Sequence, residues 1–127
     1  MLIGKIPNVP TVSNAKANNT IPITPYYAEL FADLAAERGF DGYLLNIEIS
    51  LVGGSEQARA LVAWISILRE QIQKKVGPHG KVIWYDSVTV KGELRWQDRL
   101  NALNLPYFLS SDGIFTNYWV CRSASYA

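Results

Sequence analysis

Segments with helical periodicity alternate with short apolar runs along this chain, and this alternation constrains the fold more than any other feature of the sequence. Apolar residues recur at helical spacing in three segments, 26–38, 55–76 and 96–104. Runs rich in β-branched and aromatic residues predict strands at 42–49, 81–87 and 113–120. Strands that alternate with helices of this length favour parallel βαβ units with right-handed crossovers.

Two α/β architectures fit this pattern. A doubly wound sheet normally carries a Gly-rich phosphate loop after its first strand, and Gly53-Gly54 alone does not match that motif. A (β/α)₈ barrel places its functional residues at the carboxyl ends of several strands, and four polar residues fall there: Asn46, Glu48, Asp86 and Asn117. A whole barrel needs about 250 residues, roughly twice this length. The sequence therefore predicts a partial (β/α)₈ TIM barrel of about three parallel strands with intervening helices.

The expected domain organisation has three parts. Residues 1–25 are rich in Pro and Asn and show no periodicity, which predicts an irregular lead-in. Residues 26–120 form the partial barrel, and residues 121–127 form a short tail.

Charge and residue counts exclude several classes of chemistry. The 127 residues carry 12 Lys and Arg against 11 Asp and Glu, a net charge of +1, so we expect neither nucleic acid nor an anionic membrane as a partner. A single cysteine, Cys121, and a single histidine, His79, leave no ligand set for a zinc site and no basis for histidine-assisted serine or cysteine catalysis. We therefore expect no metal and no cofactor, and chemistry based on carboxylates, amides and phenols.

Asn46 and Glu48 are the first candidate site residues. They are two positions apart in an apolar strand, so their side chains point to the same face. One interpretation is an amide and a carboxyl in a concave pocket, where apolar surroundings would raise the carboxyl pKa and allow general acid catalysis. A polar pair that caps a strand end or meets solvent explains the spacing equally well.

Aromatic and acidic residues follow the next strands. Trp84, Tyr85 and Asp86 end the second predicted strand. Further aromatic residues, expected around the loop side of the sheet, are Trp96, Tyr107, Tyr118 and Trp119. Aromatic faces stack on sugar rings and carboxylates bind hydroxyl groups, so this mixture suits a carbohydrate. For any one of these rings taken alone, a place in the core is the better interpretation.

Four motifs give the sequence a family resemblance. They are GFDGYLLNIE at 39–48, WYDSV at 84–88, WQDRLN at 96–101 and DGIFTNY at 112–118. Together, and in this order, they resemble the cytosolic-type endo-β-N-acetylglucosaminidases of glycoside hydrolase family 85. The resemblance runs from about Tyr26 to Trp119.

The resemblance implies a (β/α)₈ barrel enzyme of the cytoplasm that cleaves the bond between the two core N-acetylglucosamines of an N-linked glycan. It implies a retaining, substrate-assisted mechanism without a metal, in which the 2-acetamido oxygen of the sugar is the nucleophile. Glu48 would be the acid and base, Asn46 would orient the acetamido group, and Tyr85 would hydrogen-bond it. The implied substrate-binding residues are Trp84, Asp86, Asn117 and Trp119.

Three functional interpretations remain at this stage. The first is part of a glycan-cleaving hydrolase that is inactive as an isolated segment, because a cut barrel exposes apolar strand edges. The second is a catalytically inactive carbohydrate-binding or scaffold segment of the same barrel. The third is a small parallel α/β module whose polar strand ends bind another ligand.

Overall fold

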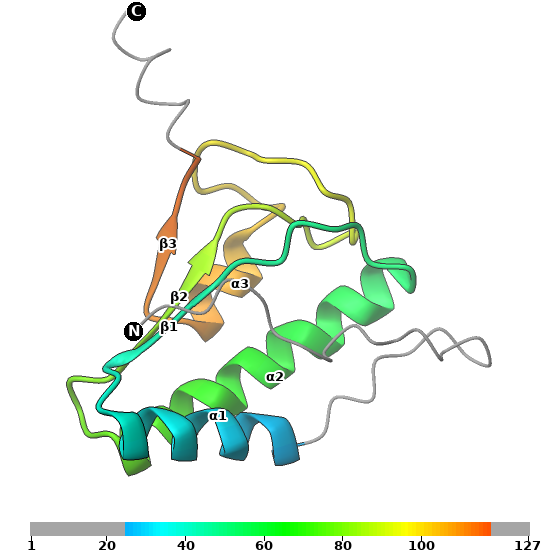
Figure 1. Ribbon diagram of the computed structural model, residues 1–127. Helices are drawn as coiled ribbons and strands as arrows, with labels where there is room; N and C mark the ends of the chain where they lie inside the picture. The colour runs from blue at the N-terminus through cyan, green and yellow to red at the C-terminus, as the bar shows by residue number, and fades with distance from the viewer. Residues whose placement is uncertain (1–24, 118–127) are drawn as a thin grey trace, which may run out of the picture.

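The computed structural model describes residues 25–117 as three helices and three strands (Figure 1). In chain order these are α1 (Pro25–Arg38), β1 (Gly42–Leu45), α2 (Gly54–Lys75), β2 (Lys81–Tyr85), α3 (Leu105–Ser110) and β3 (Gly113–Phe115). The strands form one parallel sheet in the order β1-β2-β3. The α/β class and the three parallel strands predicted from the sequence are confirmed.

All three described helices cover the same face of this sheet. Tyr43 and Leu45 of β1 and Val82 and Trp84 of β2 are buried in one core with residues of α1 and α2. The ring of Trp84 stacks on Tyr107 of α3, with centroids 4.1 Å apart. Side chains of alternate residues point to opposite faces, so Leu44, Ile83 and Tyr85 face away from the helices.

An apolar hollow of about 370 Å³ lies along this second face. It is lined by residues of all three strands and by the residue just before β1: Asp41, Gly42, Tyr43, Leu44, Lys81, Ile83 and Phe115. The Phe115 side chain is 54% exposed. Within the described residues, this side of the sheet therefore carries apolar surface without a helix over it.

Close strand packing explains the glycine at the start of β1. Gly42 has φ of 148°, and a Cβ there would lie only 1.7 Å from the carbonyl oxygen of Lys81. Gly42 and Lys81 are paired in the parallel ladder. A larger residue at position 42 would therefore separate the two strands.

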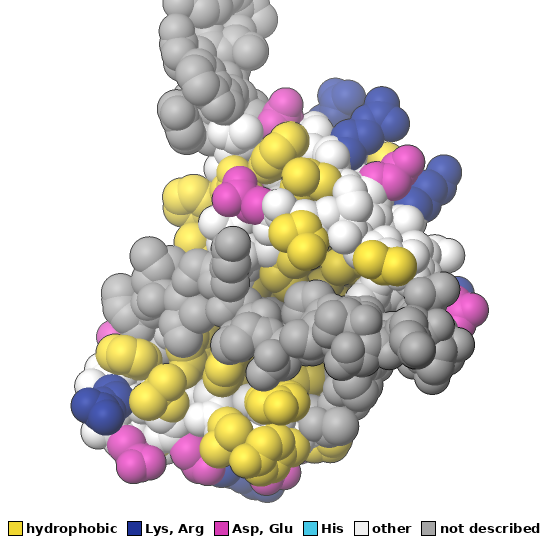
Figure 2. Space-filling model, turned by 45° about the vertical axis from the view of Figure 1, so that its right-hand side comes forward, with side chains coloured by type: hydrophobic (Ala, Val, Ile, Leu, Met, Phe, Trp, Pro, Cys, Tyr) yellow, Lys and Arg dark blue, Asp and Glu magenta, His cyan; other side chains and the backbone are white. Residues whose placement is uncertain are grey.

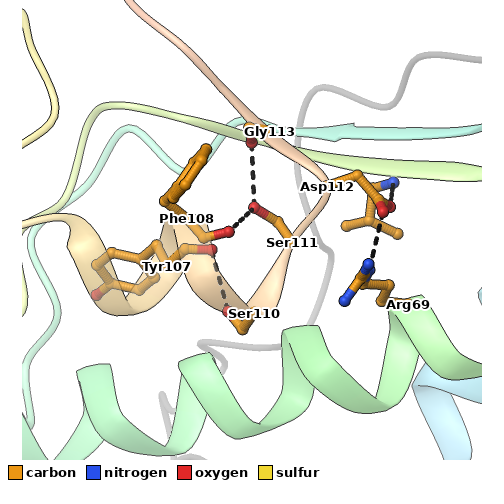
Figure 3. A network of polar contacts seen from close by, with 8 residues as sticks. Arg69, Tyr107, Phe108, Ser110, Ser111, Asp112 and Gly113 are labelled. Atoms are coloured by element: carbon orange, nitrogen blue, oxygen red, sulfur yellow. Dashed lines mark hydrogen bonds and ion pairs between the residues drawn. The ribbon is translucent and has the colours of Figure 1, made fainter.

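A buried carboxylate joins β3 to β2 and α2. Asp112 accepts hydrogen bonds from Nε of Arg69 and the backbone N–H of Val82, both at 2.8 Å, and its own N–H donates to the Val82 carbonyl at 2.7 Å (Figure 3). Nearby, the hydroxyl of Ser111 donates to the carbonyls of Phe108 and Gly113 across the turn between α3 and β3. These contacts fix where β3 begins beside β2.

We expect Asp112→Ala to destabilise the chain by about 3 kcal/mol, because it removes a charge-assisted bond and leaves the Val82 N–H without its acceptor. Asp33→Ala is the matched control, since Asp33 forms an exposed ion pair with Lys75 and should contribute less than about 0.5 kcal/mol. Urea unfolding followed by tryptophan fluorescence compares the two variants. Equal unfolding midpoints would contradict this role of Asp112.

The helix predicted over 96–104 is wrong. That segment is irregular, and the third helix begins at Leu105 instead. Side chains of Asp86, Asn101 and Asn104 accept hydrogen bonds from four backbone N–H groups of this segment, in place of helical hydrogen bonds. The four donors are Gln97, Asp98, Asn101 and Leu103. Pro106 stands in the first turn of α3, where its missing N–H costs no hydrogen bond.

The predicted strands are longer than the observed ones, and the boundary of the lead-in shifts by one residue. β1 and β2 end at Leu45 and Tyr85, before the polar residues that follow them. Pro25 belongs to α1 rather than to the lead-in. The remaining lead-in and the tail at 121–127 lie outside the described residues, as does the predicted strand beyond Asn117.

No helix within residues 25–117 has the length and apolar character needed to cross a membrane. Exposed hydrophobic side chains do occur at several places over the described face in Figure 2. Within residues 25–117, the exposed large hydrophobic residues include Leu30, Leu34, Val52, Leu109 and Phe115.

Candidate active site

The candidate site lies at the carboxyl edge of the sheet, toward the top of Figure 1. Asn46 and Glu48 directly follow β1, Tyr85 is the last residue of β2, and Asn117 comes two residues after β3. Parallel strands bring these positions to one edge although up to 71 positions separate them in the sequence, counted from 46 to 117. This is the edge at which open and closed α/β sheets place their ligands.

Asn46 and Glu48 point the same way, as their spacing predicted. The Asn46 Nδ2 donates to Oε2 of Glu48 at 3.3 Å. The Asn46 Oδ1 is buried and has no hydrogen-bond partner among the described residues. Within this part of the chain β1 is an end strand of the sheet, paired with β2 alone.

The surroundings of the two side chains differ. Asn46 is half-buried, whereas Glu48 is exposed, so the described residues do not enclose the Glu48 carboxyl in the apolar pocket expected from the sequence. The exposed carboxylate is open to proton exchange with a ligand or with water.

A buried hydroxyl holds the segment between Asn46 and Glu48. Ser87 is fully buried, and its Oγ donates to the carbonyl of Ile47 at 2.6 Å. Ile47 itself packs into the core. This bond links the end of β2 to the backbone that carries both candidate catalytic side chains.

Tyr85 lies on the same side of the sheet, away from the helices. Burial raises the pKa of its phenol, a hydrogen bond from the Trp96 side chain lowers it, and the negative charges of Glu48, Asp86 and Asp98 raise it further, with a net shift upward. The Tyr85 ring contacts the ring of Phe115 at 6.3 Å. Tyr85 is therefore a protonated phenol at neutral pH, close enough to Glu48 to sense its charge.

Two predicted binding residues lie elsewhere. The Trp84 side chain is fully buried on the helix-facing side, stacked on Tyr107, because alternation along β2 sends it away from Tyr85. Asp86 is 1% exposed, and both of its carboxylate oxygens accept hydrogen bonds from the loop 95–104. In this arrangement neither side chain faces a ligand at the carboxyl edge.

Of the remaining two predicted residues, Asn117 is within the part of the chain that the structure describes. Asn117 is half-buried beyond the end of β3, which places it at the carboxyl edge. Trp119 lies outside the described residues. Among residues 25–117 no three His, Cys, Asp or Glu side chains group as metal ligands.

Sequence reasoning missed the contributions of Ser87 and Asn104. Asn104 is fully buried, and its Nδ2 donates to Asp86 Oδ1 and to the carbonyl of Arg99. For Ser87, the sequence offered one signal: a small polar residue stands directly after an apolar strand. Asn104 stands just before the Leu105-Pro106 helix start, and its role depends on a loop that spacing does not predict.

Comparison with known proteins identifies the family. The sequence profile described as Glycosyl hydrolase family 85 matches residues 10–124. Cytosolic endo-beta-N-acetylglucosaminidase 2 of Arabidopsis thaliana is 48% identical over 92 residues, 72% of this chain and 13% of that protein. Cytosolic endo-beta-N-acetylglucosaminidase of Mus musculus is 43% identical over 91 residues, 72% of this chain and 12% of that protein.

The chain spans only about an eighth of the length of these relatives. The human protein of the same name is 46% identical over 79 residues, 62% of this chain and 10% of its own length. The profile match nevertheless covers most of the chain, including all of the described residues. The chain therefore belongs to glycosyl hydrolase family 85.

Proposed function

We propose that this chain supplies part of the active site of an endo-β-N-acetylglucosaminidase that cleaves the GlcNAc-β-1,4-GlcNAc core bond of N-linked glycans. The observation that carries the proposal is the pair Asn46 and Glu48 beside Tyr85 at the carboxyl edge of the sheet. The names of the relatives support the substrate class and a cytosolic location.

We also propose that residues 26–120 form part of a (β/α)₈ barrel. In a doubly wound sheet helices cover both faces, whereas in a barrel all helices lie outside and the inner face is filled by strand side chains. The three described helices share one face of the sheet, and the other carries Leu44, Ile83 and Phe115 around an apolar hollow. Further strands of a barrel would close over these side chains.

The first chemical step uses the substrate as its own nucleophile. The 2-acetamido oxygen attacks the anomeric carbon, the glycosidic bond breaks, and Glu48 gives its proton to the leaving oxygen. The product is an oxazoline-like intermediate. Substrate assistance is an exception to the two-carboxylate rule, so one acid–base carboxyl suffices.

Asn46 and Tyr85 stabilise the reacting acetamido group in this mechanism. The buried Asn46 Oδ1, without a partner among residues 25–117, is an acceptor for the acetamido N–H. The Tyr85 oxygen accepts a hydrogen bond from Trp96, so its own hydrogen points elsewhere and suits the acetamido oxygen. Donors and acceptors held in place before the reaction stabilise charge as it develops.

The second step returns the enzyme to its starting state. Glu48, now ionised, takes a proton from water as the water attacks the anomeric carbon. The oxazoline-like ring opens, the acetamido group re-forms, and two inversions give net retention. Exposure of the Glu48 carboxylate allows this water to reach it.

The proposal is tested by grafting residues 26–117 into the Arabidopsis relative in place of its matching segment. We expect the grafted enzyme to release glycans from a glycopeptide and the 127-residue chain alone to release none. A graft that folds and binds the glycopeptide without turnover would instead support the inactive carbohydrate-binding interpretation. Turnover by the isolated chain would show that a closed barrel is unnecessary.

A further inference from the structure

A single buried side chain ties the loop 95–104 to the end of β2. Asp86 directly follows Tyr85 and is 1% exposed. Its Oδ2 accepts the backbone N–H groups of Gln97 at 2.9 Å and Asp98 at 2.8 Å, and its Oδ1 accepts Nδ2 of Asn104 at 3.0 Å. One carboxylate therefore holds the loop at both of its ends.

The loop backbone is shaped around this carboxylate. Asp98 has φ of 65°, the left-handed region that costs an L-residue about 1 kcal/mol or more. Successive N–H groups that converge on one point form a concave anion site, and here the chain's own carboxylate fills it. Three donors to one buried charge offset both its desolvation and the backbone strain.

This anchored loop carries Trp96, the residue before Gln97. The Trp96 side chain acts as a hydrogen-bond donor toward the Tyr85 phenol, which lowers the pKa of that group. Because Asp86 fixes the peptide group immediately after Trp96, it limits where the indole can lie relative to Tyr85. Asp86 and Tyr85 are adjacent in β2 but point to opposite faces, so the loop connects them around the end of the strand.

We propose that Asp86 is a positioning residue, whose carboxylate holds the loop 95–104 so that Trp96 orients the Tyr85 hydroxyl toward the substrate. Asp86 touches no substrate itself. The inference rests on the proposed function for the role of Tyr85, but the anchoring of the loop is independent of it.

The first arm of the test measures hydrogen exchange in the 127-residue chain by mass spectrometry. We expect Asp86→Asn to reduce protection in the 95–104 peptide about tenfold or more, while peptides of α2 keep theirs. Asp98→Asn is the matched control, because it makes the same charge change within the loop that Asp86 holds, and asparagine tolerates positive φ. Unchanged loop exchange, or exchange lost equally in α2, would overturn the proposal.

The second arm asks whether Asp86 acts through Trp96, using the graft and a double-mutant cycle. We expect Asp86→Asn to lower kcat about tenfold with KM changed less than about twofold, but to have under a twofold effect when Trp96→Phe is already present. A tenfold loss in both backgrounds would show that Asp86 does not act through Trp96.

The two arms separate this inference from the proposed function. An inactive graft together with selective loss of loop protection in Asp86→Asn would reject the proposed function while leaving the anchor in place. An active graft with a loop insensitive to Asp86→Asn would reject the inference alone.

Discussion

Glu48→Gln in the grafted enzyme is expected to lower kcat for natural glycans by about 10²- to 10⁴-fold, the usual contribution of a general acid. Glutamine keeps the size of the side chain and an acceptor for the Asn46 amide, so the geometry of the pair should survive. What is lost is the proton for the leaving oxygen. Rates of glycan release from a glycopeptide measure this effect.

Activity on a second substrate distinguishes a variant that lacks the general acid from a variant that is misfolded. A glycoside with a good aryl leaving group departs with little protonation, so Glu48→Gln should impair the first step of its cleavage far less. Glu37→Gln is the matched control, an exposed glutamate on α1, remote from the carboxyl edge of the sheet. Near-normal release of natural glycans by Glu48→Gln would rule out the acid–base assignment.

Asn46→Ala is expected to lower the rate of hydrolysis of natural glycans by about 10²- to 10³-fold. This is the usual loss in rate when one preorganised polar group is removed from the place where charge develops. The expectation follows from the buried Oδ1 of Asn46, the acceptor that the acetamido N–H would use. Single-turnover rates on a glycopeptide isolate the step in which the oxazoline-like intermediate forms.

A preformed sugar oxazoline bypasses that step. Asn46→Gln, which keeps an amide, should therefore retain much more of its activity on an oxazoline donor than on a natural glycan. Glu48→Gln is the comparison variant. It should lose activity on the oxazoline donor as well, because the second step still needs the carboxylate as a base. Equal losses on both donors in Asn46→Gln would mean that Asn46 does not act on the formation of the intermediate.

Local patterns in the sequence predicted the main elements correctly. Helix α1 followed from its apolar periodicity and helix α2 from a longer stripe that ends at Gly77-Pro78. The parallel order followed from alternation of strands and helices. The shared direction of Asn46 and Glu48 followed from two-residue alternation, which persists for a few residues beyond the end of β1.

The loop 95–104 shows why other features were not predictable. Its apolar spacing suggested a helix, but the Asp86 carboxylate, eleven and twelve positions away, takes the N–H groups of Gln97 and Asp98. A hydrogen-bond partner supplied by a distant residue is invisible to a local pattern. The irregular loop forms because these long-range bonds, together with those of Asn101 and Asn104, replace the helical ones.

The same reason explains why the sequence predicted only part of the candidate site. Sequence alone determined which polar residues follow the strands, and it paired an amide with a carboxyl at Asn46 and Glu48. Only the tertiary structure decided that Trp84 packs against Tyr107 and that Asp86 binds the loop 95–104. Tyr85 lies on the other face, where the charge of Glu48 contributes to raising its pKa. Which face of a sheet the helices cover depends on how all the elements pack together, and that packing separates core residues from residues that can meet a ligand.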